Sequence, residues 1–204
     1  MEPNQETRHS FILSAVSDFI EWGNRWLTLS GWMLKSGETF FKRLEVMMLI
    51  LTSFCISLPF WIDRIPRTAA LVIAILLIQR IIELVIVYSR NFIFHRGRIF
   101  SYFKNDQDRG EWLLLMLSLN VAQIISIFAT WYQLISLSLP GSFSHVLSAI
   151  DSLYFSVITF STVGYDDIFP LYTLPKILVM SQNLLTFFVL VVVINGVAAA
   201  HFKK

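Results

Sequence analysis

Residues 140–170 read PGSFSHVLSAIDSLYFSVITFSTVGYDDIFP, and this stretch decides how the rest of the chain is interpreted. It opens with the turn signal Pro140-Gly141 and continues over 144–160 as a largely apolar, amphipathic run without a helix breaker. We therefore expect a short helix over 144–160. The run ends at residues 161–167, STVGYDD, where we expect irregular backbone.

Two long apolar stretches flank this segment, and two more precede them. They cover 112–139 and 174–202 on either side, with 44–62 and 68–88 upstream. A helix needs roughly 20 residues to cross a hydrocarbon core, and runs this long without alternating polarity are helices. The composition agrees, since 55% of the 204 residues are hydrophobic and only 15% are charged. The sequence predicts an all-α integral membrane protein with four transmembrane helices.

Lysine and arginine are distributed unevenly along the chain. They are concentrated within 8–43 and 90–109, and the tail adds Lys203 and Lys204, whereas 138–175 contains neither and carries three aspartates. By the positive-inside rule, we expect both termini and the 89–111 loop in the cytoplasm of a plasma (inner) membrane. The 140–170 segment then lies outside.

The first 88 residues divide into two parts. Residues 1–43 are expected to form a cytoplasmic segment, in which the apolar residues of 11–34 recur near helical spacing. We interpret 11–34 as an amphipathic helix on the membrane surface, with a cytoplasmic helix packed on the protein as the alternative. The spans within 44–88 are joined by only a few residues, 63–67, and so form an antiparallel hairpin.

Arg80 and Glu83 are charged residues within the second span. Their i, i+3 spacing places both on one helix face, where they can form an ion pair. The pair is either a gating contact or a structural contact that faces the last two spans or snorkels inward. A voltage sensor needs arginines at every third residue of one helix, so we expect none here.

Other functions are excluded or lack a signal. The net charge of +2 is too small for a nucleic-acid partner, and one cysteine, Cys55, permits no intramolecular disulfide. The four histidines lack metal-ligand spacing, and no enzyme motif occurs, so we expect neither an enzyme nor a cofactor. Residues 1–10 are unlike a cleavable signal peptide, and we expect no ligand-binding domain after the last span.

The 140–170 segment favours a cation. A short helix that ends within the membrane leaves its last carbonyls unpaired, and its dipole places partial negative charge at that end. Irregular backbone at membrane depth is tolerated only where protein shields it or where it lines a water-filled path. These properties indicate an ion pathway.

At this point the sequence resembles the potassium channel pore domain. The resemblance runs through 151–170, DSLYFSVITFSTVGYDDIFP, and extends over 112–202 when the flanking spans are included. It implies that 112–204 is a pore domain, with an outer helix, a re-entrant pore helix, a selectivity filter and an inner helix. The filter would be Thr162, Val163, Gly164 and Tyr165, whose carbonyls replace the hydration shell of K⁺. Since one chain supplies one filter strand, the resemblance implies a homotetramer around a central pore.

The residues around the filter receive roles from the same resemblance. Those expected to support it are Tyr154, Phe155, Ile158 and Thr159. Asp166 and Asp167 would surround the outer mouth with carboxylates and raise the local cation concentration. Asp166 stands where the family usually has a glycine in a left-handed conformation, which Asp tolerates with some strain; equally, it could only turn or cap the chain. Ile158 stands where some relatives carry a buried Glu, so no Glu–Asp pair can form.

The last span would line the inner cavity. Family members often bend this helix at a glycine near its middle, and the matching position here is Thr186. Gly196 comes later and is followed by alanines. It is either a gating bend or a packing and capping glycine.

The function expected from the sequence is therefore passive, potassium-selective conduction across a membrane, without an evident voltage sensor. The expected partners are other copies of the chain, membrane lipid and permeant K⁺. One alternative is a weakly selective Na⁺/K⁺ channel, because Asp166 changes the outer end of the filter. More distant alternatives are a K⁺ transporter subunit, which needs four such loops per chain, and a non-conducting membrane protein.

Overall fold

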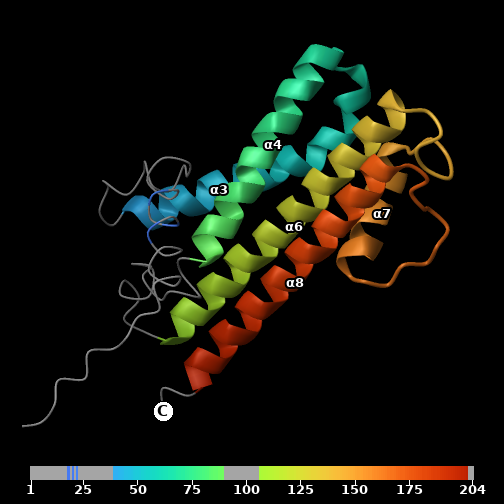
Figure 1. Ribbon diagram of the computed structural model, residues 1–204. Helices are drawn as coiled ribbons and strands as arrows, with labels where there is room; N and C mark the ends of the chain where they lie inside the picture. The colour runs from blue at the N-terminus through green and yellow to red at the C-terminus, as the bar shows by residue number, and fades with distance from the viewer. Residues whose placement is uncertain (1–17, 19, 21, 23–38, 90–105, 202–204) are drawn as a thin grey trace, which may run out of the picture.

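A computed structural model describes residues 39–89 and 106–201, together with Asp18, Ile20 and Trp22 (Figure 1). Residues 90–105, which make up most of the cytoplasmic loop expected at 89–111, and nearly all of the amphipathic helix expected at 11–34 lie outside the described residues. The fold is all-helical within the described part. Its elements are the helices α3 (Thr39–Ser57), α4 (Arg67–Tyr88), α6 (Asp106–Ser138), α7 (Ala149–Phe160) and α8 (Thr173–His201), with the 3₁₀ turns η1 (Leu58–Phe60) and η2 (Ile62–Arg64).

Four helices of the described chain are long and apolar enough to cross a membrane. The candidate spans are Arg43–Phe60, Arg67–Tyr88, Gly110–Ser138 and Thr173–Val192. They coincide with the four apolar stretches of the sequence, which confirms a multi-pass integral membrane protein. The helices α6 and α8 extend beyond the length a bilayer requires, and they run antiparallel to each other (Figure 1).

The first two spans pack differently from a simple hairpin. The chain reverses through η1 and η2, and Pro66 precedes the first residue of α4. However, α3 packs most extensively on α6 rather than on α4. The buried side chains Cys55, Leu77 and Ile127 form a small apolar cluster where α3, α4 and α6 meet. The helix α6 therefore joins the first half of the chain to the second.

A polar network crosses the same junction. Arg80 on α4 forms the ion pair with Glu83 that their spacing predicted, at 2.6 Å. The Arg80 Nε atom also donates to Gln123 Oε1 on α6 at 2.9 Å, and Gln123 Nε2 donates to Thr52 Oγ1 on α3 at 2.7 Å. Arg80 thus faces α6, and it helps to tie three spans together.

The segment between α6 and α7 is irregular and is held by backbone hydrogen bonds to the segment before α8. Ser144 N donates to Phe169 O at 3.0 Å, and Leu171 N donates to Ser142 O at 2.8 Å. Because residues 142–144 are engaged in this way, α7 begins at Ala149. The expectation that the helix starts at residue 144 was therefore wrong by about one turn.

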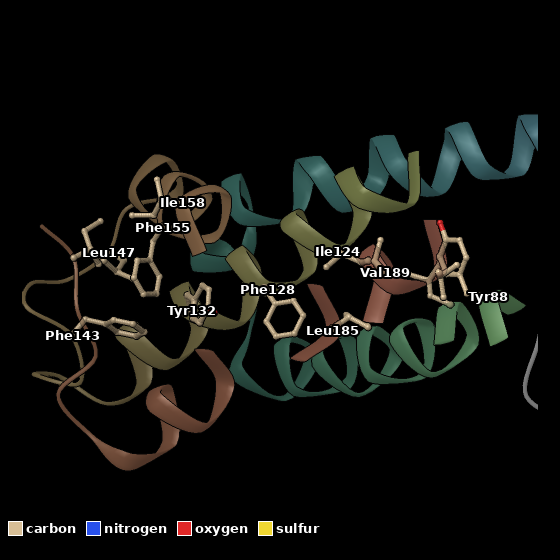
Figure 2. Close-up of a cluster of buried hydrophobic side chains, with 13 residues drawn as sticks. Tyr88, Ile124, Phe128, Tyr132, Phe143, Leu147, Phe155, Ile158, Leu185 and Val189 are labelled. Carbon is tan, nitrogen blue, oxygen red and sulfur yellow. The ribbon is translucent and has the colours of Figure 1, made fainter. Parts of the chain in front are cut away.

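The core of the last three helices is largely aromatic and aliphatic. Tyr132, Phe143 and Phe155 contact one another edge to face, with ring centroids 4.9–5.9 Å apart. Figure 2 shows this group at one end of a buried row that continues along α6 and α8 through Phe128, Leu185 and Val189. The short helix α7 is thus anchored at the end of the α6–α8 pair where α6 ends and α8 begins.

Candidate functional site

The helix α7 begins with a complete capping box. Ser148 is the N-cap, and its Oγ atom accepts from Asp151 N at 3.2 Å, while Asp151 Oδ2 accepts from Ser148 N at 3.0 Å. The Ser148 hydroxyl also donates to Asp151 Oδ2 at 2.7 Å. These hydrogen bonds lower the pKa of Asp151, and the bond from the hydroxyl has a larger effect than the bond from the backbone. Nearby His145 lowers the pKa of Asp151 further. The capping box fixes where α7 starts.

The other end of α7 is closed by the chain that follows it. Ser161 N donates to Val157 O at 2.9 Å, Thr162 N donates to Thr159 O at 3.1 Å, and Val163 N donates to Ile158 O at 3.0 Å. The expectation that the last carbonyls are unpaired was therefore wrong for these three. The chain turns tightly beneath the helix end, so its own N–H groups reach the orphan acceptors. The helix dipole still directs partial negative charge toward this turn.

The backbone after α7 adopts left-handed conformations at alternate residues. The φ angles are +58° at Thr162, +58° at Gly164 and +62° at Asp166. The sequence predicted the left-handed positions of Gly164 and Asp166, but it gave no signal for Thr162. A Cβ atom at Gly164 would meet no neighbouring atom within 4 Å in the single chain. Backbone conformation, rather than crowding within one chain, is therefore the reason for glycine at this position.

This turn is exposed along its whole length in the single chain. Residues 161–167 are all exposed, including the apolar side chain of Val163 at 51% and that of Tyr165 at 67%. The preceding helix also exposes Val157. The four candidate filter residues thus lie consecutively on one accessible edge of the molecule.

Tyr154 connects α7 to the chain beyond the turn. A hydrogen bond between its phenol and the Asp167 side chain raises the pKa of Tyr154, and the negative charge of Asp167 acts in the same direction. The Asp167 Oδ1 atom also accepts from Ile168 N at 3.1 Å. Of the two aspartates expected at the outer mouth, both are exposed, and Asp166 occupies a left-handed position.

The other expected support residues face the protein core. Phe155 lies against Tyr132 and Phe143, and Ile158 belongs to the same buried cluster (Figure 2). Thr159 is also buried. The four support residues therefore divide into two sets: Tyr154 reaches the segment after the turn, and the remaining three anchor α7 on its neighbours.

Sequence reasoning missed three polar residues at the contact between α6, α7 and α8. Tyr132 Oη on α6 donates to Gln182 Oε1 on α8 at 2.6 Å. Gln182 Nε2 in turn donates to Ser156 O at 2.9 Å and contacts Ser156 Oγ at 3.0 Å. The available signal was a glutamine within the apolar stretch 174–202, since polar side chains inside spans are commonly functional.

The two inner-helix candidates lie within α8, which is helical through Thr173–His201. Thr186 is buried, and its hydroxyl donates to Gln182 O at 3.0 Å. Such back-bonding by threonine favours a slight helix bend. The side-chain surroundings of Gly196 lie outside the described part, so a gating bend at Gly196 stays a prediction.

The part of the chain that contains this site is similar to a known protein family. Residues 120–203 match the family model Ion_trans_2, described as an ion channel. The match includes most of α6, all of α7, the exposed turn and α8. Comparison with curated proteins and with solved structures gives no match.

Proposed function

We propose that the chain is one subunit of a passive, potassium-selective channel, and the match of residues 120–203 to an ion channel family model supports this proposal. Thr162, Val163, Gly164 and Tyr165 form one strand of its filter, and four copies surround the pore. Under this proposal 112–204 is the pore domain, 44–88 is an accessory pair of spans and α7 is the re-entrant pore helix.

The observation that carries this proposal is the alternation of φ along the exposed turn. Positive φ occurs at Thr162, Gly164 and Asp166, but not at Val163 or Tyr165 between them. Alternation of positive and negative φ can bring successive N–H groups to one side of the chain, and the carbonyl of each peptide unit then points to the other side. A row of carbonyls on one side is what a dehydrated K⁺ needs, provided that other copies complete the ring.

The electrostatics of the surroundings support a cation. The C-terminal end of α7 precedes the turn, so the helix dipole favours positive charge there. Asp166 and Asp167 follow it on the exposed side. Fourfold repetition of these carboxylates would attract cations to the outer entrance.

The four spans also support the proposed topology. An even number of spans brings the start of α3 and the end of α8 to the same side of the membrane. Since lysine and arginine concentrate in the segments 8–43 and 90–109, we assign this side to the cytoplasm of a plasma (inner) membrane. The exposed turn then opens to the outside.

Flux from proteoliposomes tests the proposal. The full-length protein is reconstituted into vesicles loaded with K⁺ or with Na⁺, and efflux is measured with and without Ba²⁺. We expect K⁺ efflux to exceed Na⁺ efflux by at least about tenfold and Ba²⁺ to block it, as a carbonyl-lined filter requires. A Gly164→Ala variant, strained at φ +58°, should assemble but conduct poorly.

Each other result contradicts a definite part of the proposal. Equal K⁺ and Na⁺ efflux would replace selectivity with weakly selective cation conduction, as the unusual Asp166 allows. Efflux of neither ion, from protein that remains folded in the vesicles, would leave a non-conducting membrane protein or a transporter subunit.

A further inference from the structure

The hydrogen bonds around Gln182 form a joint between three helices. Gln182 is fully buried in α8. Its amide oxygen accepts from the Tyr132 hydroxyl of α6, and its amide nitrogen donates to the Ser156 carbonyl of α7. Ser156 Oγ donates in turn to Ile125 O on α6 at 2.7 Å. A closed circuit of side-chain hydrogen bonds therefore links α6, α7 and α8.

This circuit requires an amide at position 182. A buried polar group without a partner is strongly unfavourable in apolar surroundings, but here both ends of the Gln182 amide are satisfied. The Ser156 carbonyl can only accept, so the nitrogen must face α7 and the oxygen must face Tyr132. A carboxylate at position 182 would lack the donor, and an apolar side chain would fill the space without joining the helices.

The joint lies only a few residues before the proposed filter in the sequence. Ser156 occupies the third turn of α7, and the next three carbonyls, those of Val157, Ile158 and Thr159, receive the N–H groups of residues 161–163. The position of α7 therefore sets where the filter strand begins. Gln182 ties α7 to α8 through Ser156.

We infer that Gln182 is a positioning residue for the filter. By holding the Ser156 carbonyl and the Tyr132 hydroxyl at once, it keeps the end of α7, and with it Thr162 and Val163, at a set distance from α8. This inference rests on the proposed function. It adds that the geometry of the filter depends on the hydrogen-bonded amide of Gln182 in α8, which does not contact the ion.

Ba²⁺ inhibition of K⁺ efflux tests this role, because Ba²⁺ competes for the filter itself. The variants are Gln182→Met, which removes the amide, Tyr132→Phe, which removes the hydroxyl donor, and Ser156→Ala, which removes the bond to Ile125 O but keeps the Ser156 carbonyl. Each changes the side-chain volume little. Loss of one or two buried hydrogen bonds should shift the Ba²⁺ inhibition constant by about tenfold and lower the K⁺/Na⁺ efflux ratio. The pair Gln182→Met with Ser156→Ala should shift it little further than Gln182→Met alone.

Ser181→Ala is the matched control on the same helix. Ser181 is exposed, and its hydroxyl bonds only within α8, to Ile177 O at 2.9 Å, so this variant should match wild type. Thermal stability and oligomer mass are measured for every variant. If Gln182→Met fails to assemble, Tyr132→Phe, which loses a single hydroxyl, carries the test.

Two failures are distinguishable. If wild-type vesicles conduct K⁺ selectively, and assembled variants of the circuit keep the wild-type Ba²⁺ inhibition constant and efflux ratio, the positioning role is overturned and the channel remains. If wild-type vesicles conduct no K⁺, the proposed function itself fails and the inference fails with it.

Discussion

Asp166 combines two physical effects at one residue. Its φ of +62° lies in the left-handed region, which costs a non-glycine residue roughly 1 kcal/mol, somewhat less for Asp than for most. Its carboxylate, repeated around a pore, raises the cation concentration at the entrance. The two effects favour different residues at this position. A glycine would relieve the backbone strain, but it would also remove the carboxylate charge.

Substitutions at Asp166 separate these effects. Asp166→Asn keeps a side chain that tolerates φ +62° but loses the charge, whereas Asp166→Gly loses both the charge and the strain. We expect both variants to lower single-channel conductance at low ionic strength. Only Asp166→Gly should also stabilise the assembly, by about 1 kcal/mol per subunit. Unchanged conductance in both variants would leave Asp166 as a turn residue only.

At the scale of the element, the two ends of α7 are determined differently. Its start is specified locally by Ser148 and Asp151, which are three residues apart and cap each other. Its end is specified by the chain beneath it, where residues 161–163 supply the N–H donors. The circuit through Gln182 then fixes where the helix lies.

The capping box predicts a pH dependence. Because the hydrogen bonds from Ser148 hold the pKa of Asp151 below its ordinary 3.8, their contribution to stability is fully present above pH 3.8. It is lost as pH falls through the lower, folded-state pKa. Thermal denaturation from pH 7 to acid should therefore show a loss in wild type that is reduced in Asp151→Asn.

Ser148→Ala is the companion variant. It should lower stability by about 1 kcal/mol at pH 7, as removal of an N-cap does, and it should flatten the acid dependence. An acid profile of Asp151→Asn that is identical to wild type would contradict a role for this carboxylate. Other carboxylates contribute equally to all three proteins, so the difference between their profiles isolates Asp151.

At the scale of the whole molecule, the exposed apolar surface exceeds what one soluble subunit could carry. Along α8 the exposed side chains Ile177, Leu184 and Phe187 recur at helical spacing. In α7, Val157 is exposed beside the turn. Lipid can cover the former, but a filter strand at the pore needs other copies of the chain beside it.

Mixing subunits measures the number that share one pore. Wild-type and Gly164→Ala chains are co-reconstituted in equal amounts, with one variant subunit assumed to stop conduction. If four subunits surround the pore, K⁺ efflux should fall to about one sixteenth of the wild-type value. A fall to one half would mean that each chain conducts alone. Equal assembly of the two chains is checked by the mass of the purified oligomer.

Several features of this protein follow from its sequence alone. The length and polarity of four stretches determine the spans, because a bilayer demands a long apolar helix wherever the backbone crosses it. Local rules predict the ion pair of Arg80 with Glu83, a left-handed step at Gly164 and a short helix before it, and the family resemblance implies the left-handed Asp166. Each of these depends on residues only a few positions apart.

The tertiary structure decided the remainder. It packs α3 on α6, closes the end of α7 and joins Tyr132 to Gln182 and Gln182 to Ser156. The last two contacts link residues 50 and 26 positions apart. No local pattern specifies such partners, because a buried amide is satisfied by whichever acceptors and donors the packing of helices brings within hydrogen-bonding distance.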